Sequence, residues 1–164
     1  MKVPVLIDDD LILTDTRAIL IYLAESSDYY SHNKRKCAII NQRLFYDAAV
    51  VFPSLIKLIK SIILQKKNEI LTKKRWKNKD AFQAVMRVLD GLLVNKFFFA
   101  NDEISIADIA IFSSVFIATK LGMNISQFSN LSAWFKRIEY LQSEELSYCA
   151  EHTLMLIKNV ANIF

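Results

Sequence analysis

The chain is poor in residues that turn or break a polypeptide: its 164 residues include only two glycines and two prolines. This scarcity argues against a turn-rich all-β fold and favours long helices joined by short connections. Hydrophobic residues make up 53% of the sequence, enough to bury a sizeable core. We therefore expect a mostly helical fold with little β structure.

The sequence also lacks long apolar runs and a cysteine framework. A membrane-spanning helix needs roughly 18 uninterrupted apolar residues, and the richest run, residues 104–118, is interrupted by three serines and an aspartate. The apolar run at residues 3–7 is too short for the core of a signal peptide. The two cysteines, Cys37 and Cys149, are too few for a disulfide scaffold. We expect a cytoplasmic protein without membrane contacts.

Positive charge is concentrated in one stretch. Residues 66–79 hold seven lysines or arginines against one glutamate, whereas the whole chain carries a net charge of +4. One aromatic residue, Trp76, lies among these cations, as on a nucleic-acid-binding surface. However, the chain has no helix-turn-helix signature, zinc spacing or second aromatic there. We interpret residues 65–79 as a solvated loop or helix ends and expect no nucleic-acid partner.

A metal site is a further alternative that the sequence offers weakly. Cys149 and His152 are three residues apart on an expected helix and would face the same way. Two ligands do not make a zinc site, and Cys37 and His32 lie far away in sequence. We expect no bound metal and no cofactor.

The first part of the chain has a mixed pattern. Residues 3–7 and 11–13 read as two strands, and the three aspartates between them read as a tight turn, which together predict a β-hairpin. Pro4 lacks an N–H and can lie only near the start or edge of its strand. A helix should follow, capped by the oxygens of Thr14, Asp15 and Thr16 and ending near residues 26–28.

The remainder reads as helices. Residues 34–64 form an apolar run that Pro53 should kink or break. Residues 80–94 are amphipathic, and residues 131–141 and 144–152 predict two shorter helices. Residues 106–121 are apolar nearly all round, which is typical of a helix at the centre of a bundle, and Gly122 should stop this helix.

Ser105 and Asp108 predict the start of that central helix. Their i, i+3 spacing is that of a capping box, in which each side chain bonds the other residue's backbone N–H. The positive end of the helix dipole also favours a carboxylate there. We interpret both residues as a structural cap.

Three segments together resemble the glutathione S-transferase family. The sequence FANDEISIADIA at residues 99–110 is similar to the entry into the central helix of that family's helical domain. NQRLFYD at residues 41–47 resembles the first helix of this domain in the insect delta and epsilon classes. Val3-Pro4 resembles the family's valine and cis-proline, which precede a β-hairpin. DTRAI at residues 15–19 resembles the sequence that follows this hairpin in the family, an acidic residue (or glutamine) and then Ser-Arg-Ala-Ile. The matches keep the family's order and spacing.

The resemblance implies a fold of two parts. Residues 1–28 correspond to the last part of a thioredoxin-like glutathione-binding domain, and residues 34–164 to the all-α C-terminal helical bundle. The family conjugates glutathione to hydrophobic electrophiles in detoxification and forms dimers. We therefore expect glutathione as co-substrate, apolar electrophiles as second substrates and a homodimer.

The resemblance also implies which residues bind. Val3 and Pro4 correspond to the residues beside the cysteinyl part of glutathione. Asp15 matches the acid that pairs with the glutathione ammonium, Thr16 matches the family's serine at the helix N-terminus, and Arg17 is a partner for the glutathione carboxylate. For Asp15 and Thr16 a plain N-cap explains the pattern equally well.

The second substrate's apolar pocket would be lined, by position, by Ala48, Phe52 and Phe116. The alternative reading, that all three are core residues, stays open. These positions indicate no particular electrophile.

One functional element of the family has no counterpart in these 164 residues. The family's catalytic Ser or Tyr, which stabilises the glutathione thiolate, lies in a strand–helix–strand unit of about thirty residues or more. The match begins after that unit, so we assign no catalytic residue. We expect the chain to bind glutathione weakly or not at all and not to catalyse conjugation. A non-catalytic ligand-holding or protein-interaction module, or an incomplete gene model of an ordinary enzyme, would give the same pattern.

Overall fold

The computed structural model describes residues 4–63, 69–100, 102–141 and 155, and for residues 69–76 it describes the backbone alone. A short hairpin pairs β1 (Leu6–Asp8) with β2 (Leu11–Leu13) in antiparallel register, so that Ile7 lies opposite Ile12. Asp9 takes a positive φ of 50° in the connecting turn, a conformation that aspartate tolerates better than most residues. The expected hairpin is confirmed, although its first strand begins later than residue 3.

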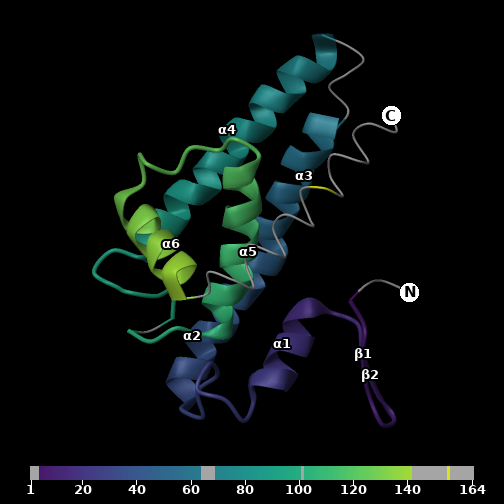
Figure 1. Ribbon diagram of the computed structural model, residues 1–164, viewed down its shortest axis with the longest axis vertical. Coiled ribbons are helices and arrows are strands. Elements are labelled where there is room, and N and C mark those ends of the chain that lie inside the picture. Colours follow the sequence, from purple (N-terminus) through teal and green to yellow (C-terminus); the bar gives the residue numbers. More distant parts are fainter. Residues whose placement is uncertain (1–3, 64–68, 101, 142–154, 156–164) are drawn as a thin grey trace.

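Helix α1 (Thr16–Ala24) follows the hairpin directly, and the two lie together beside the helical bundle (Figure 1). A small core cluster joins α1 to the bundle. It contains Ala24 of α1, Ile40 and Leu44 of α2 (Lys34–Tyr46), and Ala107 and Ala110 of α5 (Ile106–Lys120). The small alanine side chains let α1 approach the central helix closely.

The expected run over residues 34–64 divides into three segments. Helix α2 ends at Tyr46, a π-helical turn η1 spans Asp47–Val51, and α3 spans Phe52–Ile63. Within η1 the Phe52 N–H donates to the Asp47 carbonyl, the i to i+5 pattern of a π-helix. Pro53 follows immediately and cannot donate a backbone hydrogen bond. The predicted break is therefore real, and the widened turn lies just before the proline.

Helix α4 (Glu69–Leu92) corrects the interpretation of the basic stretch. We expected a loop or helix ends over residues 65–79 and a helix from residue 80, but the helix already runs through residues 69–79. Leucine, lysine, arginine and glutamate are good helix formers, and the stretch contains no glycine or proline. The helical preference of these residues outweighs the local repulsion between like charges.

Helix α5 lies at the centre of the bundle, as predicted (Figure 1). The main core surrounds it with residues of α3, α4 and α6 (Ser129–Leu141), including Leu55, Phe82, Met86 and Trp134. Helix α3 packs along α4, and α4 also contacts α6. Gly122 has a φ of +88° after the end of α5, as expected for a helix stop. The predicted helix over residues 144–152 lies outside the described residues.

Ser105 is the N-cap of α5 and forms the expected capping box with Asp108. The Ser105 N–H donates to Asp108 Oδ2 at 3.0 Å, and the Ser105 hydroxyl donates to the same oxygen at 2.8 Å. Asp108 is completely buried. Its other oxygen, Oδ1, accepts from the Phe99 N–H and from the Trp134 indole, both at 2.9 Å. This carboxylate therefore ties three parts of the bundle together.

Replacing Ser105 by alanine is expected to lower the free energy of unfolding by about 1 kcal/mol, because the helix loses its cap. Urea unfolding followed by circular dichroism checks this value. Ser113→Ala is the matched control, since Ser113 is an exposed serine of the same helix. Within the described ranges its hydroxyl bonds only the Ala110 carbonyl, at 2.8 Å. The control should change stability by less than about 0.5 kcal/mol; equal costs for the two variants would contradict the assignment of Ser105.

The described ranges contain no helix that is both long enough and apolar enough to cross a membrane.

Candidate functional site

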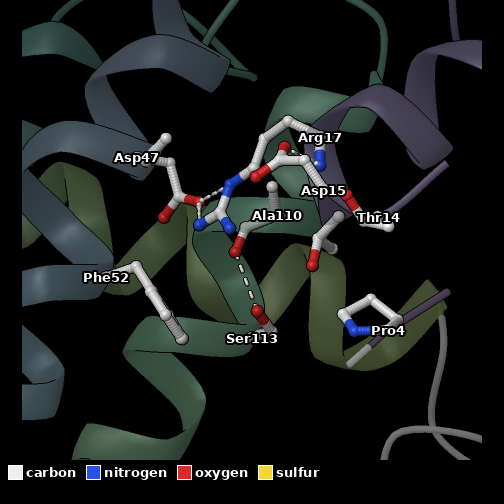
Figure 2. A pocket seen from close by; sticks show the side chains of 10 residues that line it. Pro4, Thr14, Asp15, Arg17, Asp47, Phe52, Ala110 and Ser113 are labelled. Atoms are coloured by element: carbon white, nitrogen blue, oxygen red, sulfur yellow. Dashed lines mark hydrogen bonds and ion pairs between the residues drawn. The ribbon is translucent and has the colours of Figure 1, made fainter. Parts of the chain in front are cut away.

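A pocket lies where the start of α1 faces η1, α3 and α5 (Figure 2). Its volume is about 380 Å³. One side carries the start of the chain and of α1, and the other side carries η1 and α3. The lining residues are Pro4, Thr14, Asp15, Thr16, Arg17, Asp47, Ala48, Phe52, Ala110 and Ser113. Residues more than 90 positions apart in sequence thus share one cavity.

Asp15 is the N-cap of α1, as the sequence predicts. Its Oδ1 accepts from the N–H of Arg17 at 2.9 Å and from that of Ala18 at 3.3 Å. Its Oδ2 has no protein partner among the described residues and remains accessible, because Asp15 is exposed. The neighbouring Thr16 is the first helical residue, and within the same described ranges neither its N–H nor its hydroxyl has a partner. The cap therefore leaves one acceptor and two donors unused at the pocket.

Arg17 and Asp47 form an ion pair across the pocket. Arg17 Nε donates to Asp47 Oδ2 at 3.1 Å, and Nη2 donates to the same oxygen. The Asp47 side chain is only 1% exposed and that of Arg17 14% exposed. The guanidinium carbon also lies 5.0 Å from the centre of the Phe52 ring, within the range of a cation–π contact. The pair joins α1 to the widened turn η1 of the helical bundle.

Burial raises the pKa of the Asp47 carboxyl above the ordinary value for aspartate. The charge and hydrogen bonds of Arg17 oppose this rise, as does the Ser114 hydroxyl, whose oxygen lies 3.5 Å from Asp47 Oδ1. Asp47 lies in a π-helical turn, a feature often found at functional sites. Arg17 is therefore the main group that opposes the rise in the pKa of this buried carboxyl.

The structure brings most of the predicted binding residues together. Pro4, Asp15, Thr16 and Arg17 line the pocket with Ala48 and Phe52. Val3 lies outside the described residues. Arg17 is engaged by Asp47 through Nε and Nη2, whereas its Nη1 has no partner in the described part of the chain.

Phe116 lies elsewhere. It is buried in the main core, where its ring centroid is 5.5 Å from that of Phe112 and 6.1 Å from that of Phe135. Phe116 does not line the pocket. Ser113, about one helical turn earlier on α5, and Ala110, nearly two turns earlier, line the wall instead.

Sequence reasoning missed the role of Asp47. The residue lies inside the segment that carries one of the family similarities, yet no partner was assigned to it. Its signal is a lone acid directly before the apolar run Ala48–Ala49–Val50–Val51–Phe52. An acid in such a run is buried unless the helix turns it outward, and a buried carboxylate needs a cation. Arg17, at the N-terminus of a neighbouring helix, is that cation.

Comparison with known proteins identifies the family. Residues 45–141 match the C-terminal domain of glutathione S-transferases, and residues 1–25 match the N-terminal domain of the same family. Glutathione S-transferase 2 of Anopheles gambiae is 30% identical over 138 residues, which are 81% of this chain and 64% of the relative. Glutathione S-transferase D6 of Drosophila melanogaster is 26% identical over 141 residues, 84% of this chain and 63% of the relative. The chain thus spans less than two thirds of the length of these relatives.

Solved structures agree in fold. A glutathione transferase of Bombyx mori superposes with a TM-score of 0.81 at 24% identity. The superposition covers 99% of this chain and 74% of the Bombyx mori chain. The unclassified glutathione S-transferase 2 of the same organism superposes with a TM-score of 0.78 at 26% identity, over 99% of this chain and 71% of its own. The similarity to insect proteins that the sequence motifs indicate is confirmed. The chain belongs to the glutathione S-transferase family.

Proposed function

We propose that the pocket at the start of α1 binds the γ-glutamyl end of glutathione. The supporting observation is that the N-cap of α1 leaves Asp15 Oδ2 and the Thr16 N–H and hydroxyl unpaired among the described residues, on one wall of a cavity. The γ-glutamyl end carries an ammonium and a carboxylate on the same carbon atom. Asp15 Oδ2 suits the ammonium, and the Thr16 donors at the positive end of the helix suit the carboxylate.

Arg17 supports this site mainly by holding the first turn of α1 in place. Its ion pair with Asp47 fixes the first turn of α1 against η1, and a ligand-binding group that is fixed in advance loses less entropy on binding. Nη1 has no partner among the described residues and remains for a direct bond to the glutathione carboxylate. We assign Arg17 as a positioning residue that also lends its charge to the pocket.

The opposite wall suits an apolar second substrate. Phe52 is 41% exposed, and Ala48 and Ala110 add small apolar surface beside it. An aromatic or alkyl electrophile that packs on Phe52 would lie next to the α1 N-terminus. We therefore propose that the pocket serves the family's pairing of glutathione with a hydrophobic compound, with Phe52 and Ala48 as contacts of that compound.

Binding of glutathione to the 164-residue chain tests the proposal by titration calorimetry. We expect weak, saturable binding that Asp15→Asn reduces about tenfold, because the ammonium loses its charged partner. Asp10→Asn removes the same charge from the exposed hairpin turn and should leave the affinity unchanged. Equal losses in both variants would indicate a nonspecific charge effect and contradict the site.

We also propose a homodimer of the family type, with α2 at the interface. Phe45 on α2 is 67% exposed, although it is a large aromatic side chain, and Ile39 on the same helix is partly exposed. Large exposed apolar side chains on one element are typical of contact surfaces. Sedimentation velocity at micromolar concentration should show a dimer that Phe45→Ser weakens. A stable monomer of the unaltered chain would contradict this proposal.

A further inference from the structure

A second hollow, unrelated to the α1 pocket, lies between the loop after α4 and helix α6. Its volume is about 390 Å³, and its lining includes Asn95, Lys96, Phe97, Asn130 and Arg137. Helix α6 lies at the far left of the bundle and α1 at the lower right (Figure 1), and the two cavities share no lining residue. The hollow is therefore a separate feature of the helical domain.

Arg137 is held in place on the wall of this hollow. Its Nη1 donates to the Phe97 carbonyl at 2.6 Å. The guanidinium carbon lies 5.0 Å from the centre of the Phe97 ring and 5.6 Å from that of the buried Phe98 ring. These contacts leave Nε and Nη2 without a partner among the described residues. Nε and Nη2 form the edge of a guanidinium that binds two oxygens of a carboxylate or phosphate at once.

The neighbouring acids form no ion pair with the cations of the hollow in the described part of the chain. Neither Lys96 nor Arg137 belongs to an ion pair within the described ranges. Asp90 is already engaged, because it accepts from the Leu131 N–H at 2.8 Å and from Asn130 Nδ2 at 3.3 Å. Glu139 is two residues from Arg137 on the same helix, and residues at that spacing do not face each other. Two cations thus line one cavity without an ion pair to a described carboxylate.

Phe97 adds an aromatic surface to the same hollow. Its side chain is 58% exposed, so part of the ring surface is accessible to a ligand. Asn95, in a left-handed turn with a φ of 57°, brings an amide side chain to the cavity between Leu93 and Lys96. The lining therefore combines two cations, hydrogen-bonding amides and an accessible ring edge.

We propose that this hollow binds a small aromatic oxyanion, an aryl phosphate or aryl carboxylate. The oxyanion lies on the free edge of Arg137 with Lys96 as a second positive charge, and the aromatic ring of the ligand packs against Phe97. The guanidinium is fixed before the ligand arrives, so little side-chain entropy is lost on binding. The site lies outside the glutathione pocket and does not depend on the function proposed for that pocket.

Phenyl phosphate is a suitable probe, followed by ¹H–¹⁵N correlation spectra of the whole chain. We expect saturable shifts of amides in residues 95–98 and 130–137, and weaker binding of inorganic phosphate. Arg137→Gln and Lys96→Gln should each weaken phenyl phosphate binding about tenfold. Lys136→Gln is the matched control, because it removes the same charge from the same helix at a residue outside this hollow.

Two results would overturn the proposal. The first is the absence of localised shifts at millimolar phenyl phosphate, and the second is an equal loss of affinity in the Lys136→Gln control. Because Arg137 also bonds the Phe97 carbonyl, its variant is checked for an unchanged melting temperature. Lys96 is exposed and makes no such bond, so Lys96→Gln keeps the test valid if Arg137→Gln fails to fold.

Discussion

Replacing Asp108 by asparagine is expected to lower the free energy of unfolding by about 3–5 kcal/mol. The carboxylate is completely buried and accepts four hydrogen bonds from three residues. Asparagine keeps one acceptor oxygen and turns an NH₂ group toward the remaining donors, so part of this network is left unsatisfied. Since small proteins have a total stability of about 5–15 kcal/mol, the variant should be close to unfolding.

Urea unfolding at neutral pH measures this cost. Asp80→Asn is the matched control, because Asp80 is exposed on α4 and its side chain has no hydrogen bond to another described residue. The control should change stability by less than about 0.5 kcal/mol. If Asp108→Asn is equally mild, Asp108 does not hold the Phe99 loop, the α5 cap and Trp134 of α6 together as described.

Replacing Arg17 by methionine is expected to cost about 3 kcal/mol, because it leaves Asp47 as a buried charge without a partner. Asp47→Leu alone should also be destabilising, because it leaves the Arg17 guanidinium without its partner. The double variant should be less destabilised than the sum of the two single variants, since it removes both charges together. Urea unfolding of the four proteins forms the double-mutant cycle, and additive costs would show that the ion pair contributes nothing to α1 docking.

The Arg17→Met variant should also respond to pH in a defined direction. Burial raises the pKa of Asp47, and Arg17 opposes that rise. Without Arg17, native Asp47 binds a proton more tightly than the same residue in the unfolded chain. The free energy of unfolding of the Arg17→Met variant should therefore fall as the pH rises above the ordinary aspartate pKa of about 3.9 and through the raised pKa of native Asp47. The Asp47→Leu variant has no carboxyl at this position. If its stability falls with pH in the same way, the pH dependence belongs to another group.

Local signals in the sequence predict much of the fold. The spacing of Ser105 and Asp108 fixes the start of the central helix within one residue, because capping depends on neighbouring groups only. The apolar period of residues 80–94 identifies the buried face, and Phe82, Val85, Met86 and Leu89 are all in the core. The basic stretch wrongly predicts a loop over residues 69–79. Charged residues indicate that a segment is exposed, but they do not indicate that a helix ends.

The site is only partly predictable for a different reason. Asp15 and Thr16 are recognisable because an N-cap and an anion site use the same local groups. The partner of Arg17 lies 30 residues away, and the choice between Phe116 and Ser113 depends on where along α5 the pocket forms, because residues three apart share one helix face. Pairings and positions of this kind arise from tertiary packing. The hollow at Arg137 likewise depends on a loop and a helix that lie 40 residues apart.

The most direct test of the glutathione site compares two ligands that differ by one group. Glutathione carries the γ-glutamyl end, and cysteinylglycine is the same thiol without it. Spectra of the ¹⁵N-labelled chain should show saturable shifts of the Thr16, Arg17 and Ala18 amides with glutathione, and almost none with cysteinylglycine at equal concentration. Equal shifts with both ligands, or shifts that spare the first turn of α1, would contradict the central claim that this helix N-terminus recognises the γ-glutamyl group.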